Sequence, residues 1–404
     1  SRGLGDVYKR QALLLGMVLW VIYALSCDSI VPQVAGAKFQ AYLADNSSLA
    51  GKSLHEQALQ YVLNVDIVEH LGDICQTLLF LIGAMTIVEL IDVHGGFRVI
   101  TDKITTRRKR HLLWILAFTT FFMSAILDNL TTTIVMLMLL RKLLQTKTER
   151  WMYAACIVIA ANSGGAWSPI GDITTIMLWV NGNVTAGALI EYTLLPSLVS
   201  MILPVWIVSK RLHGELRPIS ITVKEDLGFT TRERNTMFYL GVGGLIFVPV
   251  FKSITHLPPF VGILFVLGVL WVFTEIFYNT KMLEKAKEHR IPKVIARVDM
   301  PSILFFLGIL MAVAVLQSTG ILSWMAGALD EHVHNIYITD TLLGVMSSIV
   351  DNVPLVAAAM GMYPVADPGA VGYAADFVVN GTFWELLSYC AGVGGSILII
   401  GSAA

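Results

Sequence analysis

The chain contains several apolar stretches about as long as a lipid bilayer is thick. Examples are residues 12–25 ("ALLLGMVLWVIYAL"), 188–208 and 260–278, and a helix needs about 20 apolar residues to cross a membrane. Only 14% of the 404 residues are charged, whereas soluble proteins carry about 25%. The sequence therefore predicts an all-α polytopic membrane protein.

Most lysines and arginines gather in four loops. Residues 98–110, 141–150, 210–234 and 281–297 hold 6, 4, 6 and 6 of them. Loops on the cytoplasmic side of a membrane are enriched in Lys and Arg. We therefore place all four loops on the cytoplasmic side.

The apolar segment from His111 to Leu140 lies between two of these basic loops. Both of its ends are then on one side of the membrane, which predicts a re-entrant hairpin that turns near Asp128 and Asn129. A carboxylate in the middle of an apolar run costs about 2.5–3.5 kcal/mol on insertion scales. Such a residue indicates a function.

The motif at this tip occurs a second time. At an offset of 223, the matching residues are Met123, Ser124, Asp128 and Asn129 with Met346, Ser347, Asp351 and Asn352. The glycine-rich segments 162–172 and 392–402 match at an offset of 230. Several matching blocks in the same order predict an internal repeat.

The number of crossings between the two hairpins determines their relative orientation. The predicted crossings are 152–180 (broken at its glycines), 185–210, 236–252, 258–279 and 301–327. An odd number of crossings inverts the second copy, so we predict two inverted-topology repeats, each with a re-entrant helical hairpin and a broken transmembrane helix. Paired interrupted helices in inverted repeats indicate a transport site near the membrane midplane.

The chain divides into six predicted parts. They are an artefactual tag (1–11), an N-terminal helix with an external loop (12–70), inverted repeat 1 (71–211), a cytoplasmic linker (212–235), connecting helices with a further linker (236–300), and inverted repeat 2 (301–404), which we expect to be truncated at its C-terminal end.

The polar residues of the two hairpins and the two helix breaks form the predicted site. The predicted set is Ser124, Asp128, Asn129, Asn162, Gly165, Asp172, Thr174, Thr175, Ser347, Asp351, Asn352 and Gly395. Hard oxygen ligands with negative charge suit a small hard cation. Carboxylates removed from water also exchange protons near neutral pH. A site that holds either a cation or protons is the minimum requirement for a cation/proton antiporter.

Four motifs are similar to those of NhaD-type sodium/proton antiporters of the ion transporter superfamily. They are "LIGAMTIVELIDVHGGF", "SAILDNLTTT", "NSGGAWSPIGDITT" and "SSIVDNVP", and the resemblance extends over residues 12–404. The resemblance implies inverted repeats, a homodimer, and transport of Na⁺ or Li⁺ against H⁺. In carboxylate-transporting relatives the tips carry Ser-Asn-Thr. Here Asp128 and Asp351 replace that serine, which favours a cation.

Two other functions compete with cation/proton exchange. One is a carrier of a small anion such as a dicarboxylate, sulfate or arsenite, which the acidic tips and the lack of buried cationic groups disfavour. The other is a channel or a membrane scaffold without transport. Because no enzyme motif is present, we expect no catalysis, cofactor or nucleic-acid partner. We expect the lipid bilayer to be that of a bacterial inner membrane or a plastid envelope.

Several of these residues also have a purely structural interpretation. Asp128, Asp351 and Asp172 can cap helices. The hydroxyls of Thr131–Thr133 can bond to carbonyls four residues earlier. Near the cytoplasmic end of 71–95, Glu89, Asp92 and His94 form either a solvated helix end or a proton uptake route with a pH sensor.

Overall fold

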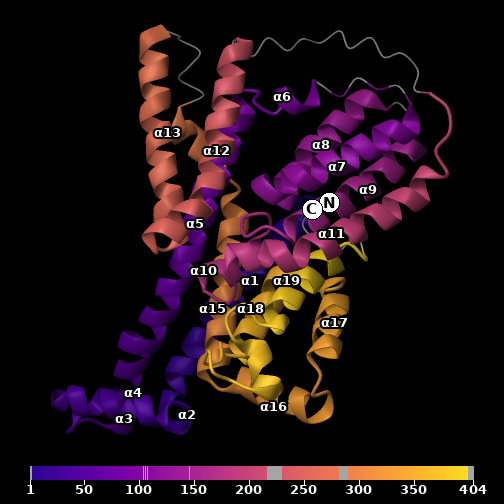
Figure 1. Cartoon of the computed structure of the whole chain (residues 1–404). Helices are drawn as coiled ribbons and strands as arrows, with labels where there is room; N and C mark the ends of the chain where they lie inside the picture. Colours follow the sequence, from indigo (N-terminus) through magenta and orange to yellow (C-terminus); the bar gives the residue numbers. More distant parts are fainter. Residues whose placement is uncertain are drawn as a thin grey trace.

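The computed structural model describes residues 2–398, except for positions 103, 105, 107 and 145 and the stretches 216–229 and 282–289. Within these residues the elements are helices, and the extended pairing is one isolated bridge between Arg108 and Glu215. The long helices, shown in Figure 1, are α1 (Arg2–Leu25), α5 (Ile67–Val93), α11 (Ala186–Ser209), α12 (Thr231–Thr255), α13 (Pro259–Lys281) and α15 (Met300–Ser318).

Among the described residues, six helices are long and apolar enough to cross a membrane. The number becomes seven if the pair Gln11–Leu25 and Cys27–Val34, bent by 86°, is one span. The flanks of α11 and α12 expose large apolar side chains such as Leu195, Trp206 and Ile246, as expected for surfaces in contact with lipid. The prediction of an all-α polytopic membrane protein is confirmed.

Both predicted hairpins are pairs of helices that break at the predicted tips. The first consists of α7 (Lys109–Leu127) and α8 (Asn129–Leu143), and the second of α17 (Ile336–Ser347) and α18 (Asn352–Met362). The two arms of each pair contact each other. Figure 1 places α7 and α8 in the upper part of the molecule and α17 and α18 in the lower part. The inverted membrane topology remains a prediction.

The predicted break in 152–180 separates α9 (Lys147–Gly165) from α10 (Ile173–Val180). In the second copy, α19 (Thr382–Gly394) ends at the matching glycines, and the residues from 399 onward lie outside the described part of the chain. The glycines allow a close approach to the hairpins. A Cβ on Gly164 would lie 2.2 Å from the carbonyl oxygen of Phe121, and one on Gly394 would lie 2.2 Å from that of Gly344.

These two contacts join positions that correspond at the sequence offsets given above. Each helix that ends in a break therefore packs against the first arm of its hairpin in the same way. The repeat in the sequence is thus accompanied by a repeat in the packing.

The N-terminal region differs from the predicted external loop. It contains α2 (Cys27–Val34), α3 (Gly36–Asp45), a short 3-10 turn (Ser47–Leu49), α4 (Leu54–Tyr61) and a π-helical turn (Val62–Asp66) that continues into α5. Val31, Phe39 and Tyr61 are buried, so each short helix buries one apolar side. Ser53 and Glu56 form a capping box that starts α4, which explains why the long helix begins before residue 71.

The predicted crossing 301–327 is wrong at its C-terminal end. Helix α15 ends at Ser318, and Gly320 has a φ of 75° before α16 (Ile321–His332) begins. Positive φ suits glycine and ends a right-handed helix. The remaining short elements are α6 (Arg98–Thr101), α14 (Ile291–Ile295) and the 3-10 segment Gly372–Phe377.

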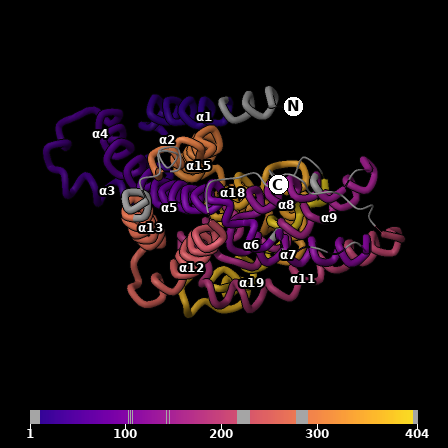
Figure 2. Tube along the Cα trace, turned by 90° about the horizontal axis from the view of Figure 1, so that it is seen from above, coloured from indigo at the N-terminus to yellow at the C-terminus, as the bar shows by residue number. Residues whose placement is uncertain are grey.

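Helix α1 packs along α15, and Figure 2 shows the two side by side at one edge of the molecule. A Cβ on Gly16 would lie 2.3 Å from the carbonyl oxygen of Gly308, and one on Gly308 would lie 2.4 Å from the Cα of Leu13. Small residues let helix backbones touch inside a membrane. Trp20 Nε1 also donates to the carbonyl oxygen of Met311 at 3.0 Å.

Candidate functional site

The carboxylate of Asp128 caps helix α8. Its Oδ1 accepts hydrogen bonds from the backbone N–H groups of Leu130 (2.7 Å) and Thr131 (3.4 Å), and its Oδ2 accepts from Thr131 Oγ1 at 2.7 Å. The φ of Asp128 is 75°, a conformation that non-glycine residues rarely adopt. The structural interpretation therefore has a geometric basis. A carboxylate offers about four lone-pair sites, so a cap leaves oxygen valence for a cation.

The tip of the second hairpin differs from the first. Asp351 occupies the N-cap position of α18 but forms no side-chain cap hydrogen bond. The side chain is partly exposed. Asp351 therefore lacks the close side-chain cap of Asp128, although the backbone N–H groups of Asn352 and Val353 interact with its carboxylate.

The serines before the two tips make equivalent contacts. Ser124 Oγ donates to the carbonyl oxygen of Ala161 at 2.5 Å, and Ser347 Oγ donates to that of Ala391 at 2.7 Å. Both serines are fully buried. Each hydroxyl oxygen keeps its lone pairs after it donates its proton, so both remain possible ligands.

Side-chain amides connect the two copies at one buried centre. Asn129 Nδ2 donates to Asn162 Oδ1 (3.2 Å), and Asn162 Nδ2 donates to Ser396 Oγ (2.9 Å). Asn352 Nδ2 donates to Asp172 Oδ2 (3.0 Å). The predicted residues from both hairpins thus meet residues from both helix breaks. We call this group the tip centre.

Asp172 is the most buried of the three predicted carboxylates, with 2% of its surface exposed. It caps α10 in a capping box with Thr175, whose Oγ1 donates to the carbonyl oxygen of Asp172 at 2.8 Å. The hydroxyl of Thr175 is therefore occupied. By contrast, the buried hydroxyl of Thr174 has no hydrogen-bond partner among the described residues, which makes it the better candidate ligand.

Asp172 is close enough to both tip carboxylates for their charges to act on it. Asp172 lies within electrostatic range of both Asp128 and Asp351. Three carboxylates near one another repel when all are ionised, and a cation or bound protons relieve that repulsion. The arrangement can therefore hold positive charge, supplied either by a metal ion or by protons.

The glycines at the breaks allow the chain to turn back on itself. A Cβ on Gly165 would lie 2.6 Å from the carbonyl oxygen of Gly171. Gly395 is buried directly after α19. Both glycines thus lie where the backbone leaves helical geometry, as the predicted site requires.

The threonines after the first tip depart from their structural interpretation. Thr131 donates to Asp128, whereas the buried hydroxyls of Thr132 and Thr133 have no partner among the described residues. The expectation that these hydroxyls bond to carbonyls four residues earlier is therefore wrong.

The acidic end of α5 contains both exposed and buried groups. Asp92 is exposed, and Glu89 forms an ion pair with Arg297 at 3.8 Å. His94 is only 1% exposed, with its Nδ1 2.6 Å from the carbonyl oxygen of Leu90. The interpretation as a solvated helix end is therefore wrong for His94.

Lys252 is a cationic residue near the end of a span. It lies in the last turn of α12, and its Nζ donates to the carbonyl oxygen of Trp179 at 2.6 Å and lies 4.8 Å from the centre of the Trp179 ring. This contact is at the far end of α10 from Asp172. Eight helical residues span about 12 Å, so Lys252 is not part of the tip centre.

Ser396 belongs to the tip centre but was absent from the predicted set. It aligns with Ala166 at the offset of 230, so the internal repeat does not mark this position as polar in both copies. Its position directly after the matched Gly395 was the one signal that could have identified it.

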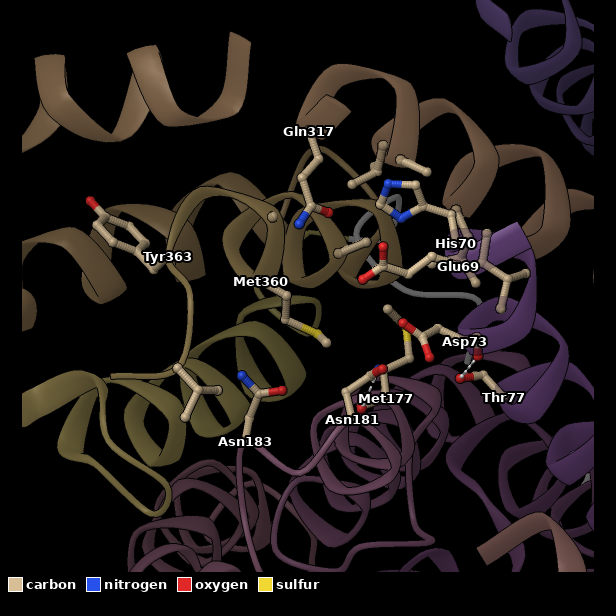
Figure 3. A pocket seen from close by; sticks show the side chains of 17 residues that line it. Glu69, His70, Asp73, Thr77, Met177, Asn181, Asn183, Gln317, Met360 and Tyr363 are labelled. Carbon is tan, nitrogen blue, oxygen red and sulfur yellow. Dashed lines mark hydrogen bonds between the residues drawn. The ribbon is translucent and has the colours of Figure 1, made fainter. Parts of the chain in front are cut away.

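A separate cavity of about 250 Å³ lies among α5, α15, α18 and the segment after α10. Figure 3 shows Glu69 and Asp73 directed into it from α5, with Asn181 and Asn183 from the segment after α10 and Gln317 from α15. No residue of the predicted site lines this cavity. It is therefore distinct from the tip centre.

A buried centre of oxygen groups, built from two helical hairpins and two helix breaks inside a membrane bundle, is typical of secondary transporters. The comparisons with known proteins agree. The profile of the citrate transporter family (CitMHS) matches residues 12–379. The chain is 42% identical over 346 residues to "Sodium/proton antiporter 2" of Arabidopsis thaliana, which covers 85% of this chain and 80% of the relative.

Two further relatives carry similar names. "Na(+)/H(+) antiporter NhaD" of Alkalimonas amylolytica is 32% identical over 362 residues, covering 83% of this chain and 70% of the relative. "Sodium/proton antiporter 1" of Arabidopsis thaliana is 44% identical over 344 residues, covering 84% of this chain. The chain spans 57% of the length of that relative. The chain belongs to the citrate transporter family and, within it, to the NhaD-type antiporters.

Proposed function

We propose that the chain exchanges Na⁺ or Li⁺ for H⁺ across a membrane. The observation that carries this proposal is the tip centre, where Asp172 accepts from Asn352 of the second hairpin and lies within electrostatic range of Asp128 and Asp351. The names of the relatives support the same activity.

Competition between Na⁺ and H⁺ is the proposed mechanism. Sodium requires ionised carboxylates and neutral oxygens, which Asp351, Asp172 and the free hydroxyl of Thr174 supply. A proton on either carboxylate removes the charge that holds Na⁺, so Na⁺ and H⁺ bind alternately. The two ligands drive the conformational change only through different affinities for the two states. We propose that the two repeats are inverted and alternate the exposure of this centre.

The alternative is a carrier of a small anion on the same fold. The description of the family profile names citrate as a transported molecule. An anion needs cationic partners, but Lys252, which lies in the last turn of the spanning helix α12, contacts the end of α10 opposite to Asp172. The carboxylates of the tip centre would repel an anion. We therefore favour the cation.

The assembly and the host membrane are part of the same proposal. The exposed apolar side chains of α11 and α12 can be covered either by lipid or by a second copy of the chain. We propose the homodimer that the family resemblance implies. A mass measurement in lipid nanodiscs that gives one chain per particle would contradict it. Relatives from bacteria and a plant support a bacterial inner membrane or a plastid envelope.

Proton flux across proteoliposomes tests the activity. The purified full chain is exposed to a pH gradient, and Na⁺, Li⁺, K⁺, sulfate or citrate is added. We expect Na⁺ and Li⁺ to dissipate the gradient, and the apparent KM for Na⁺ to rise as the pH falls, because protons compete. Asp128→Asn and Asp351→Asn keep the shape but remove the exchangeable charge, so each should abolish exchange. Robust exchange by both variants, or dissipation by the anions alone, would overturn the proposal.

A further inference from the structure

Two buried carboxylates lie outside the tip centre, on the elements that support the second hairpin. Asp340 on α17 is 0% exposed and Glu385 in the first turns of α19 is 6% exposed. None of their four carboxylate oxygens has a hydrogen-bond partner among the described residues. The chain from residue 298 to its end contains no lysine or arginine, so this part of the molecule offers no cationic side chain to pair with them.

Packing does not require acidic residues at these positions. The bond from Ser347 to Ala391 is equivalent to the bond from Ser124 to Ala161 in the first copy, so these residues align the two copies. Asp340, seven residues before Ser347, then corresponds to Ala117. Glu385, six residues before Ala391, corresponds to Ala155. The first copy therefore has alanine at both equivalent positions. A buried carboxylate without a partner costs free energy unless it binds a proton, so these two groups weaken the fold whenever they ionise.

Polar groups that begin at the surface lie within electrostatic range of Asp340. The partly exposed Asp330 of α16 accepts from the hydroxyls of Tyr363 (3.0 Å) and Tyr373 (2.9 Å) through its Oδ1. Asp340 lies within electrostatic range of both hydroxyls and of the Cys390 thiol. Asp330 and the two tyrosines therefore form a hydrogen-bonded group of proton-binding side chains that begins at the surface, and Asp340 lies within electrostatic range of it.

The other ends of both helices lead to the tip centre. Seven helical residues separate Asp340 from Ser347, a rise of about 10 Å, and Asp351 follows at the tip. Helix α19 also ends at the tip centre, because Gly394 is its last residue and the following Ser396 bonds to Asn162. Asp340 and Glu385 thus lie at similar levels between the surface and the tip centre.

We propose that Asp340 and Glu385 carry protons between the surface at Asp330 and the carboxylate of Asp351, as a route present in the second repeat alone. Each step breaks one O–H bond of a carboxylic acid and forms one O–H bond on the next oxygen, through a tyrosine hydroxyl or water. No electrons move, and no other reactant is needed. The inference rests on the proposed exchange of Na⁺ for H⁺.

Other titratable groups surround this route. On α9, α11, α16, α17, α19 and the segments next to them they are Lys147, Glu149, Arg150, Tyr153, Cys156, Glu191, Tyr192, Asp330, Glu331, His332, His334, Tyr337, Tyr363, Asp367, Tyr373, Asp376, Tyr389 and Cys390. His334 stacks on Tyr373, with the ring centres 4.3 Å apart. The groups that lie closest to the route, Asp330, Tyr363, Tyr373 and Cys390, therefore contribute to its pH dependence together with Asp340.

Two transport modes separate a proton route from a sodium site. In proteoliposomes of the full chain, uptake of radioactive Na⁺ driven by a pH gradient requires protons, whereas exchange of Na⁺ for Na⁺ at equal pH does not. We expect Asp340→Ala and Glu385→Ala to lower the proton-driven uptake by about tenfold or more and to leave Na⁺/Na⁺ exchange unchanged. Asp340→Glu should restore part of the proton-driven uptake.

The matched control is Asp367→Asn, which removes an exposed negative charge from the loop that also holds Tyr363 and Tyr373; both transport modes should stay unchanged. Thermal unfolding provides a second readout. Asp340→Ala should unfold at the same or a higher temperature than the wild type, because it removes an unpartnered buried carboxylate and installs the residue of the first copy. If Asp340→Ala fails to fold, the expectation about stability is overturned, and Asp340→Asn then decides the transport result.

Three results would overturn the proton route: unchanged proton-driven uptake in both alanine variants, a parallel loss of both transport modes, or no recovery with Asp340→Glu. Failure of the proposed function is a different result. It would appear in the wild type, as no Na⁺-dependent proton flux before any variant is tested.

Discussion

Asp128 and Asp351 occupy matching positions at the two hairpin tips, but their carboxylates have different surroundings. Asp128 accepts two backbone hydrogen bonds and one from Thr131, whereas Asp351 makes no side-chain cap hydrogen bond. Asp128 therefore also holds its helix in place.

The neutral ligands can be tested separately from the carboxylates. Asn352→Ala removes an amide that bonds to Asp172 at 3.0 Å, and amide groups do not titrate. We expect the apparent KM for Na⁺ to rise about tenfold, equivalent to about 1.4 kcal/mol, with little change in the pH dependence. Sodium-dependent proton flux measures both quantities. Asn64→Ala, at an exposed position, is the control, and equal KM values for the two variants would place Na⁺ elsewhere.

At the scale of elements, the breaks and the hairpins depend on close contact between backbones. Gly164→Ala and Gly394→Ala would each place a Cβ 2.2 Å from a carbonyl oxygen, so the helices must separate. We expect each to lower the free energy of unfolding by about 1–3 kcal/mol or more and to abolish exchange. Thermal unfolding in detergent measures the first effect.

Gly268→Ala is the matched control for these glycine variants, because a Cβ at this position in α13 meets no atom within 4 Å. It should be neutral or slightly stabilising, since alanine favours helix over glycine by about 1 kcal/mol. If Gly164→Ala were as stable as Gly268→Ala, the contact between α9 and α7 would not be as close as described.

The second half of the broken helix is also fixed at its far end. Lys252 donates to the last turn of α10 through the carbonyl oxygen of Trp179, and a hydrogen bond from a charged group contributes about 1.5–3 kcal/mol. We expect Lys252→Met to lower the unfolding temperature and to weaken exchange without changing the selectivity for Na⁺. The exposed Lys38→Met is the control, and equal stability of the two variants would count against an anchoring role.

The sequence predicted the elements that carry polar residues inside apolar runs. Asp128 and Asp351 were identifiable because a carboxylate stands out in such a run and because the motif repeats. The sequence did not identify the contact of Ser396 with Asn162 or the detailed capping of α8 by Asp128, because both depend on the folded arrangement. The helices within 27–66 were missed because their apolar positions are few and lie among polar residues. Asp340 carried the same signal as Asp128, but its first-copy counterpart is an alanine.

At the scale of the whole molecule, the orientation of the two hairpins is the feature that transport by alternating access requires. The positions His111 and Arg141 flank the first hairpin, and His334 and Pro364 flank the second; all four are exposed. Single cysteines at these positions, in a background without Cys27, Cys75, Cys156 and Cys390, can be labelled with a reagent that does not cross the membrane.

We expect positions 111 and 141 to react from the cytoplasmic side and positions 334 and 364 from the other side. The basic loops next to the first hairpin and the lack of Lys and Arg around the second are the physical reason. Reaction of 111 and 141 from opposite sides would show that α7 and α8 cross the membrane in succession, and the inverted arrangement would then be wrong.

The contact between Gly16 of α1 and Gly308 of α15 determines which parts of the molecule share a motion. Two helices whose backbones touch have no space in which to slide past each other. Helix α15 in turn packs against α18 of the second hairpin. The first helix of the chain therefore moves together with α15 in the last third of the chain. A larger side chain at Gly16 would displace α15 and, with it, the surface on which the second hairpin packs.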